Sequence, residues 1–152
     1  MIIREQINAD LITAMKSKDE VAKMALNSIK AAITNAEKGN GTWVATNEEV
    51  IKIISKGIKQ REESIKMYDL ANRPELVAKE HDEISILKKY MPVQMSEQEI
   101  TLALKEILQD FSVTIKNPQA LVGKTIGEFN KKYQGRADIG TVKMIVNQLI
   151  ES

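Results

Sequence analysis

The stretch TNEEVIKIISKGIKQREESIKMYDLANRP, residues 46–74, decides the fold class. Its apolar side chains recur every three or four residues, at Val50, Ile54, Ile58, Ile65 and Tyr68. This spacing predicts an amphipathic helix. Thr46 and Glu49 have the spacing of a capping box, which starts the helix. The helix should end at one of the two residues before Pro74, and a length of about 24 residues corresponds to roughly 36 Å.

The same helical periodicity extends to both sides of this stretch. Two amphipathic helices are expected before it, with apolar positions Ile3, Ile7, Leu11 and Met15, then Val21, Ala25, Ile29, Ala32 and Ala36. Pro74 can occupy the first position of a fourth helix, which continues through Leu76, Ile84, Leu87 and Met91. The third and fourth helices should form an antiparallel hairpin, onto which Trp43 folds back from its polar loop.

A second set of helices is expected after Pro92. Ser96 and Glu99 form another capping box, Asn117 and Pro118 start the next helix, and Asp138 caps the last. Residues 92–95 therefore mark a domain boundary. The sequence predicts an all-α protein with an N-terminal four-helix part, residues 1–92, that contains the long antiparallel hairpin. A small three-helix C-terminal module, residues 96–152, follows it.

Composition excludes several classes of protein. Apolar residues make up 43% of the 152, enough for a core. The net charge is +1, so the chain as a whole lacks the basic excess of a strong nucleic-acid binder, any nucleic-acid contact must be local, and no DNA partner is expected. Without cysteine, the chain has neither disulfides nor a thiolate nucleophile. The charged N-terminus and the lack of a run of about 18 apolar residues predict a cytoplasmic protein that does not contact a membrane.

The segment GKTIGEFNKKYQGRAD, residues 123–138, is the most informative for function. Its first three residues end like a phosphate-binding P-loop, but Pro118 stands where that motif needs a glycine, and no strand precedes it. Gly123 and Gly127 are one helical turn apart beside an apolar stripe. We expect them to let a neighbouring helix approach closely.

Basic side chains gather in the same region. Residues 116–143 carry six basic and two acidic side chains, a local excess of four positive charges. Lys124, Lys131 and Lys132 should face solvent, opposite the apolar stripe of their helix. Arg136 is not needed for capping, since Gly135 can end one helix and Asp138 can start the next. A solvated helix face is the commoner meaning of such a pattern, and the alternative is contact with a phosphate backbone through these four cations.

Arg61 falls in the middle of the apolar face of the long helix, together with Gly57. Glu80 and Glu83 lie at the same level of the expected hairpin. This arrangement favours a buried ion network over a metal site or a general acid–base pair, because no histidine joins the carboxylates and the arginine neutralises them. His81, the only histidine, is expected to be solvated.

Taken together, these residues resemble the YqeY-like family, which is similar to the tail of the B subunit of glutamine-dependent transfer-RNA amidotransferases. The resemblance rests on Lys59-Gln60-Arg61, Ser64, Tyr68, Ala71, Arg73, Leu76, Glu80, Glu83, Leu87, Tyr90-Met91-Pro92, Gln94, Ser96, Glu99, Gly123-Lys124, Gly127 and Gly135-Arg136-Ala137-Asp138. It implies a non-catalytic accessory protein that recognises transfer RNA or an amidotransferase complex. It implies neither a catalytic residue nor a metal or other cofactor.

The sequence departs from the family pattern at three places: at Asn27, where an arginine is usual, at Leu121-Val122, which replaces an acidic residue and methionine, and at Ile139, which replaces a glycine. Two alternatives stay open. One is the family label itself, a carbon–nitrogen ligase with glutamine as amide donor, although the chain has no cysteine nucleophile and no glycine-rich phosphate loop. The other is a helical protein-interaction scaffold.

Overall fold

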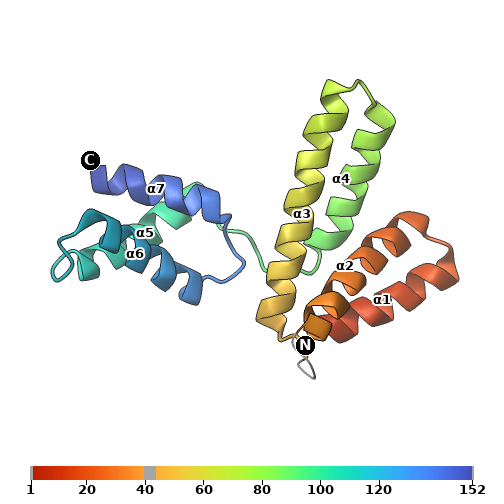
Figure 1. The fold of residues 1–152 in the computed structure, drawn as a ribbon, viewed down its shortest axis with the longest axis horizontal. Helices are drawn as coiled ribbons and strands as arrows, with labels where there is room; N and C mark the ends of the chain where they lie inside the picture. Colours follow the sequence, from red (N-terminus) through yellow and green to blue (C-terminus); the bar gives the residue numbers. More distant parts are fainter. Residues whose placement is uncertain (1, 40–43, 152) are drawn as a thin grey trace. The chain divides into compact units, whose positions relative to one another are not determined.

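The computed structural model describes residues 2–39 and 44–151. Within these ranges the secondary structure consists of helices without strands, which confirms the all-α prediction (Figure 1). Trp43, which the sequence places against the hairpin, lies outside the described residues. The helices are α1 (Ile3–Ser17), α2 (Glu20–Gly39), α3 (Asn47–Leu70), α4 (Pro74–Lys88), α5 (Glu97–Phe111), α6 (Pro118–Lys132) and α7 (Ile139–Glu151).

The chain divides into two compact units, Met1–Met91 and Pro92–Ser152, and each has its own hydrophobic core. The first unit contains α1 to α4, and the second contains α5 to α7. Among the described residues, no helix is both long enough and apolar enough to cross a membrane.

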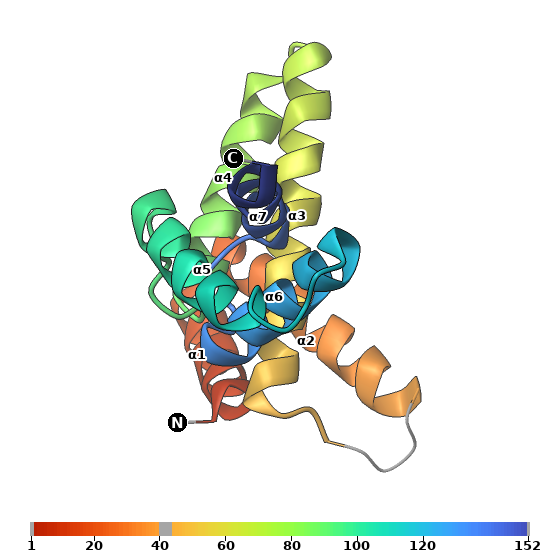
Figure 2. The ribbon, with the colours of Figure 1, turned by 90° about the vertical axis from the view of Figure 1, so that its left-hand side faces the viewer.

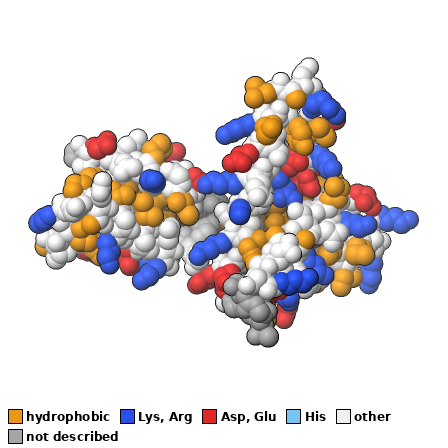
Figure 3. All heavy atoms as spheres, in the orientation of Figure 1, with side chains coloured by type: hydrophobic (Ala, Val, Ile, Leu, Met, Phe, Trp, Pro, Cys, Tyr) orange, Lys and Arg blue, Asp and Glu red, His pale blue; other side chains and the backbone are white. Residues whose placement is uncertain are grey.

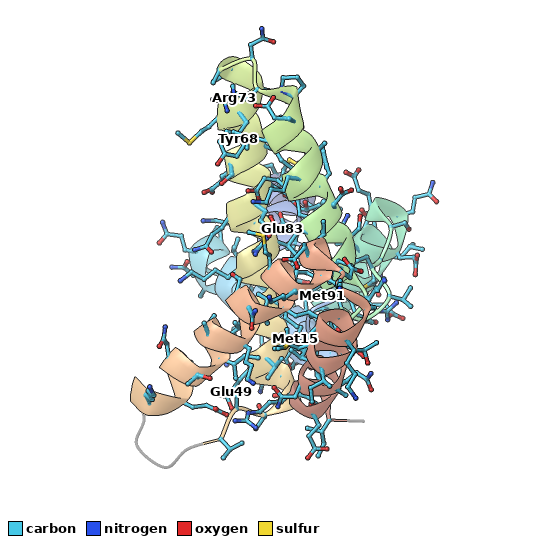
Figure 4. All side chains as sticks on the ribbon, turned by 90° about the vertical axis from the view of Figure 1, so that its right-hand side faces the viewer. Met15, Glu49, Tyr68, Arg73, Glu83 and Met91 are labelled. Atoms are coloured by element: carbon cyan, nitrogen blue, oxygen red, sulfur yellow. The ribbon has the colours of Figure 1, made fainter. Side chains whose placement is uncertain are left out.

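In the first unit, α3 and α4 lie side by side and are joined by a short turn (Figures 1 and 2). The capping box of Thr46 and Glu49 starts α3, as the sequence predicts. The helix ends at Leu70 rather than at one of the two residues before Pro74. The reason is Asn72, whose φ of 56° is left-handed and stops the helical hydrogen bonding early. Figure 4 shows Tyr68 and Arg73 near this turn and Glu83 further along the hairpin.

The buried faces of α1 and α2 differ in part from the predicted stripes. Met15 is 55% exposed, and Ala14 takes its place in the core. On α2 the core positions are Ala22, Ala25, Leu26, Ile29 and Ile33, so two of the five predicted positions are confirmed. Burial of Leu26 and Ile33 removes more apolar area from water than burial of Ala32 and Ala36 would, and this decides which face of α2 turns inward.

The second unit is a three-helix arrangement around a core to which all three helices contribute. The capping box of Ser96 and Glu99 opens α5 as expected. An extended segment precedes α5 and is bonded to the turn between α6 and α7. In it, the Met95 N–H donates to the Arg136 carbonyl oxygen at 2.8 Å, and the Gln94 side-chain amide donates to the Gly135 carbonyl oxygen, also at 2.8 Å.

Candidate nucleic-acid interface

Helix α6 carries most of the predicted RNA-contacting residues, and it starts where the sequence predicts. The Asn117 side chain caps it by accepting hydrogen bonds from the backbone N–H groups of Gln119 at 2.9 Å and Ala120 at 3.2 Å. The residues that α6 buries in the core are Leu121, Thr125 and Phe129. This face is rotated from the predicted stripe, whose members Val122 and Ile126 are only half-buried.

The prediction that Gly123 and Gly127 pack against a neighbouring helix is wrong. Both glycines are exposed, and a Cβ atom built at either position would meet no heavy atom within 4 Å. They lie almost opposite the buried face, since Gly123 follows Leu121 by two residues, or about 200° around the helix. The fold therefore does not require glycine at either position, although each costs about 1 kcal/mol relative to alanine.

The space beside the two glycines is a shallow groove of about 400 Å³. It is lined by Phe111, Gly123, Lys124, Gly127, Glu128 and Lys131. Two of the predicted contact residues, Lys124 and Lys131, are thus brought to one site. Glu128 is half-buried between them and offsets part of their charge.

The other two predicted residues lie outside the groove lining. Lys132 is exposed at the end of α6. Arg136 is half-buried, and its Nε donates a hydrogen bond to the Val93 carbonyl oxygen at 2.9 Å. Its guanidinium carbon also lies 5.9 Å from the ring centre of Tyr133. Arg136 therefore holds the segment before α5 against the turn after α6, a structural role that the sequence did not indicate.

The turn that presents Arg136 has the conformation that its residues predict. Gly135 has a φ of 74°, the left-handed region that favours glycine. The Asp138 carboxylate accepts a hydrogen bond from the Thr141 N–H at 3.1 Å, and α7 begins at Ile139. Because the aspartate satisfies this helix N-terminus, an anion is less favoured there than in the groove on α6.

The sequence did not indicate two features near this site, the part of Phe111 in the groove and the burial of Thr125 on the opposite face of α6. Phe111 is the last residue of α5, and its half-buried ring forms one wall of the groove. Its position at the end of an apolar stripe gives no signal that it also faces a neighbouring helix. Thr125 is fully buried, and its hydroxyl has no hydrogen-bond partner among the described residues. The predicted apolar stripe does not include Thr125, so the buried face of α6 lies closer to Leu121 and Thr125 than expected.

The predicted ion network in the hairpin is not formed. Arg61 makes no direct ion pair with Glu80 or Glu83, and its Nη1 instead donates to the Gly57 carbonyl oxygen at 3.1 Å. Glu83 is buried, at 6% exposure. Burial raises the pKa of the Glu83 carboxyl, while the positive charge of Arg61 acts in the opposite direction.

Across the described residues, no group of three potential metal-ligating side chains comes together.

On the face drawn in Figure 3, charged side chains are spread over both units. In Figure 3, lysine and arginine side chains are interspersed with acidic ones on the face shown, and no single basic patch dominates it. This matches the net charge of +1. Any electrostatic attraction for a nucleic acid must therefore come from a local group of cations such as Lys124, Lys131 and Lys132.

Comparison with known proteins places these features in a family. The family described as Yqey-like protein matches residues 4–150. The chain belongs to the YqeY-like family. A relative in Saccharomyces cerevisiae (strain YJM789), "Altered inheritance of mitochondria protein 41, mitochondrial", is 34% identical over 129 residues, which cover 83% of this chain and 69% of the relative. Proteins with the same name match in Pyrenophora tritici-repentis, at 29% identity over 90% of this chain and 74% of the relative, and in Meyerozyma guilliermondii, at 32% over 82% and 68%.

These relatives correct one prediction. We expected a cytoplasmic protein, whereas the relatives are named as mitochondrial proteins, so the expectation is contradicted. The composition of the folded domain is equally compatible with the cytoplasm and with mitochondria, because targeting segments rather than the folded domain specify location.

Of the three departures from the family pattern, Asn27 and Ile139 are exposed, and Leu121 belongs to the buried face of α6.

Proposed function

We propose that this protein is a non-catalytic accessory protein that binds structured RNA, with transfer RNA as the preferred candidate, through the groove on α6. The observation that carries the proposal is the pair Gly123 and Gly127. They leave open space between Lys124 and Lys131 at a cost to helix stability, and no contact within the fold accounts for them. Glycine on a binding surface allows a ligand backbone to come close to the helix.

The charges beside the glycines support a phosphate backbone as that ligand. Lys124 and Lys131 line the groove, Lys132 adjoins it, and all three are exposed. Arg136 is a fourth contact candidate from the following turn, with its Nε already bonded to the chain. The resemblance of the sequence to the amidotransferase B-subunit tail favours transfer RNA, alone or in complex with such an enzyme.

The test is filter binding of bulk transfer RNA over a range of salt concentrations. Four phosphate contacts predict a log–log slope of roughly −3 to −4, at about −0.7 to −0.9 per contact. Lys131→Ala should reduce the slope by about one unit, because one phosphate contact is lost. Lys52→Ala is the matched control, an exposed lysine on α3.

Glycine variants separate shape from charge in the same assay. Gly127→Ala should weaken binding by about tenfold, or about 1.4 kcal/mol, and leave the salt slope unchanged, because the added methyl group carries no charge. Gly39→Ala, at an exposed α2 position where a Cβ would also meet nothing within 4 Å, is the control. Equal affinities of Gly127→Ala and the parent would exclude the groove as the contact surface. Glutamine hydrolysis measured in parallel would favour the ligase alternative, and salt-insensitive binding would favour a protein partner.

A further inference from the structure

Arg61 is the residue of the first unit that the fold leaves unexplained. It lies on the inward side of α3, half-buried, without the ion pair that would offset desolvation of a guanidinium group. Its Nε is buried and has no hydrogen-bond partner among the described residues. Its Nη1 is held by the carbonyl oxygen of Gly57, one turn earlier. The side chain is thus fixed in place with part of its hydrogen-bonding capacity unused.

A cavity of about 270 Å³ lies beside Arg61, between α2 and α3. Figures 2 and 4 show that α2 diverges from α3 toward its C-terminal end. The α2 wall consists of Ser28, Ile29, Ala32 and Ala36. The α3 wall consists of Ile53, Lys56, Gly57, Gln60 and Arg61.

The lining has a consistent chemical character. Its charged groups are the ammonium of Lys56 and the guanidinium of Arg61, and no carboxylate belongs to it. Ser28 and Gln60 add neutral hydrogen-bonding groups, and the isoleucines and alanines form an apolar floor. A guanidinium group presents its N–H donors in a planar fork that matches a carboxylate or a phosphate.

We propose that this cavity binds a small organic anion, a carboxylate or phosphate carried on a short apolar group, with Arg61 and Lys56 holding the anion. The volume is just below the range of about 300–1,000 Å³ usual for small-molecule sites, so the ligand is compact. Glu83 lies close enough to interact electrostatically with Arg61 without touching it, and this reduces the net attraction for an anion. Binding is therefore weak, and the site is independent of the RNA groove on α6.

The test is thermal unfolding of the full chain with defined probes at constant ionic strength: phenyl phosphate, benzoate, inorganic phosphate and benzyl alcohol. Phenyl phosphate or benzoate should raise the Tm of the first unit saturably, by roughly 6–11 °C at ten times its Kd. Inorganic phosphate and benzyl alcohol should have smaller effects, because the first has the anionic group without an apolar group and the second has the apolar group without a charge. The two anionic arms separate a phosphate site from a carboxylate site. No saturable shift with either anion at concentrations up to about 50 mM would overturn the proposal, since a Kd beyond this corresponds to negligible affinity.

Two variants assign the effect to the cavity. Arg61→Gln should weaken binding of the active probe at least tenfold, and Ala32→Leu should abolish it by filling the cavity from the opposite wall. Ala31→Leu is the matched control, because Ala31 is an exposed neighbour on α2 that does not line the cavity. The Ala32→Leu variant keeps the proposal testable if Arg61→Gln fails to fold. Equal shifts in Ala32→Leu and Ala31→Leu would show that the anion binds elsewhere and would overturn the assignment.

Discussion

Helix α3 of the first unit and helix α6 of the second both carry glycine in their interior, yet the surroundings of these glycines are opposite. A Cβ added at Gly57 would lie 2.9 Å from the Ile29 Cδ1 atom and 3.4 Å from the Arg61 Nη1 atom. A Cβ added at Gly123 or Gly127 would meet nothing within 4 Å. Packing explains the first glycine. Gly123 and Gly127 weaken α6, and no contact within the chain accounts for them, which points to a ligand.

The two units have separate hydrophobic cores, so each should fold without the other. Removing a whole unit should have the largest effect of the changes considered. We predict that a fragment of residues 92–152 folds alone, because it has its own core. Its stability should be low, since domains of this size bury only about 60% of their unfolded surface. Circular dichroism during heating should show a cooperative helical transition. A gradual, non-cooperative loss of helix would mean that the two units share their stability.

A large side chain at Gly57 should have the greatest effect of the point substitutions. Gly57→Leu is expected to lower the free energy of unfolding by about 3 kcal/mol, because the leucine overlaps Ile29 and displaces Arg61. Gly57→Ala should cost less, since its gain in helix propensity of about 1 kcal/mol offsets part of the overlap. Urea unfolding measures both, with Ser55→Leu, at an exposed position on α3, as the control. If Gly57→Leu is as stable as this control, packing does not require glycine at position 57, and Gly57 does not differ from the two glycines of α6.

Local signals in the sequence determine most of the fold. Capping boxes at Thr46 and Ser96, the proline that starts α4 and the cap at Asp138 are short-range features, and the structure has a helix start at each. What the sequence did not determine is the rotation of a helix about its own axis. Met15 and Ala14 are adjacent apolar residues, and the packing of α1 buries the smaller of the two, which the spacing of apolar residues does not indicate.

The rotation of α6 about its own axis likewise decides which of its residues line the candidate groove. The sequence identifies Lys124, Lys131 and Lys132 as solvent-facing, and they are exposed. The glycines were expected at a helix contact because they adjoin the apolar stripe, whereas the helix buries Leu121, Thr125 and Phe129 and leaves both glycines exposed. The Arg136 bond to Val93 joins residues 43 positions apart in the chain, and the expected ion pair of Arg61 depended on the exact side-chain geometry between two facing helices. No local pattern encodes such contacts.

Alanine at both α6 glycines should stabilise the protein. Gly123→Ala with Gly127→Ala is expected to raise the free energy of unfolding by about 1–2 kcal/mol, because each change improves helix propensity and reduces the conformational freedom of the unfolded chain. Urea unfolding measures the gain. It should coincide with the loss of RNA affinity predicted for Gly127→Ala, the opposite of what a structural glycine shows. If the double variant is less stable than the parent, the fold requires glycine at these positions, as it does at Gly57.

The smallest effect concerns Glu83, which is buried in the hairpin near the Gly57–Arg61 bond. Burial raises the pKa of this carboxyl above its ordinary value of 4.5, so the folded state holds its proton more tightly than the unfolded state. Stability should therefore fall as pH rises from 4.5 through the raised pKa, and ionised Glu83 should be a net cost at pH 7. Glu83→Gln should then gain on the order of 1 kcal/mol at pH 7 and nothing at pH 3.5, where both side chains are uncharged. Urea unfolding at the two pH values, with Asp82→Asn at an exposed position as the control, measures the difference. A loss of stability in Glu83→Gln at pH 7 would mean that the attraction between ionised Glu83 and Arg61 outweighs the cost of burying the carboxylate, contrary to this prediction.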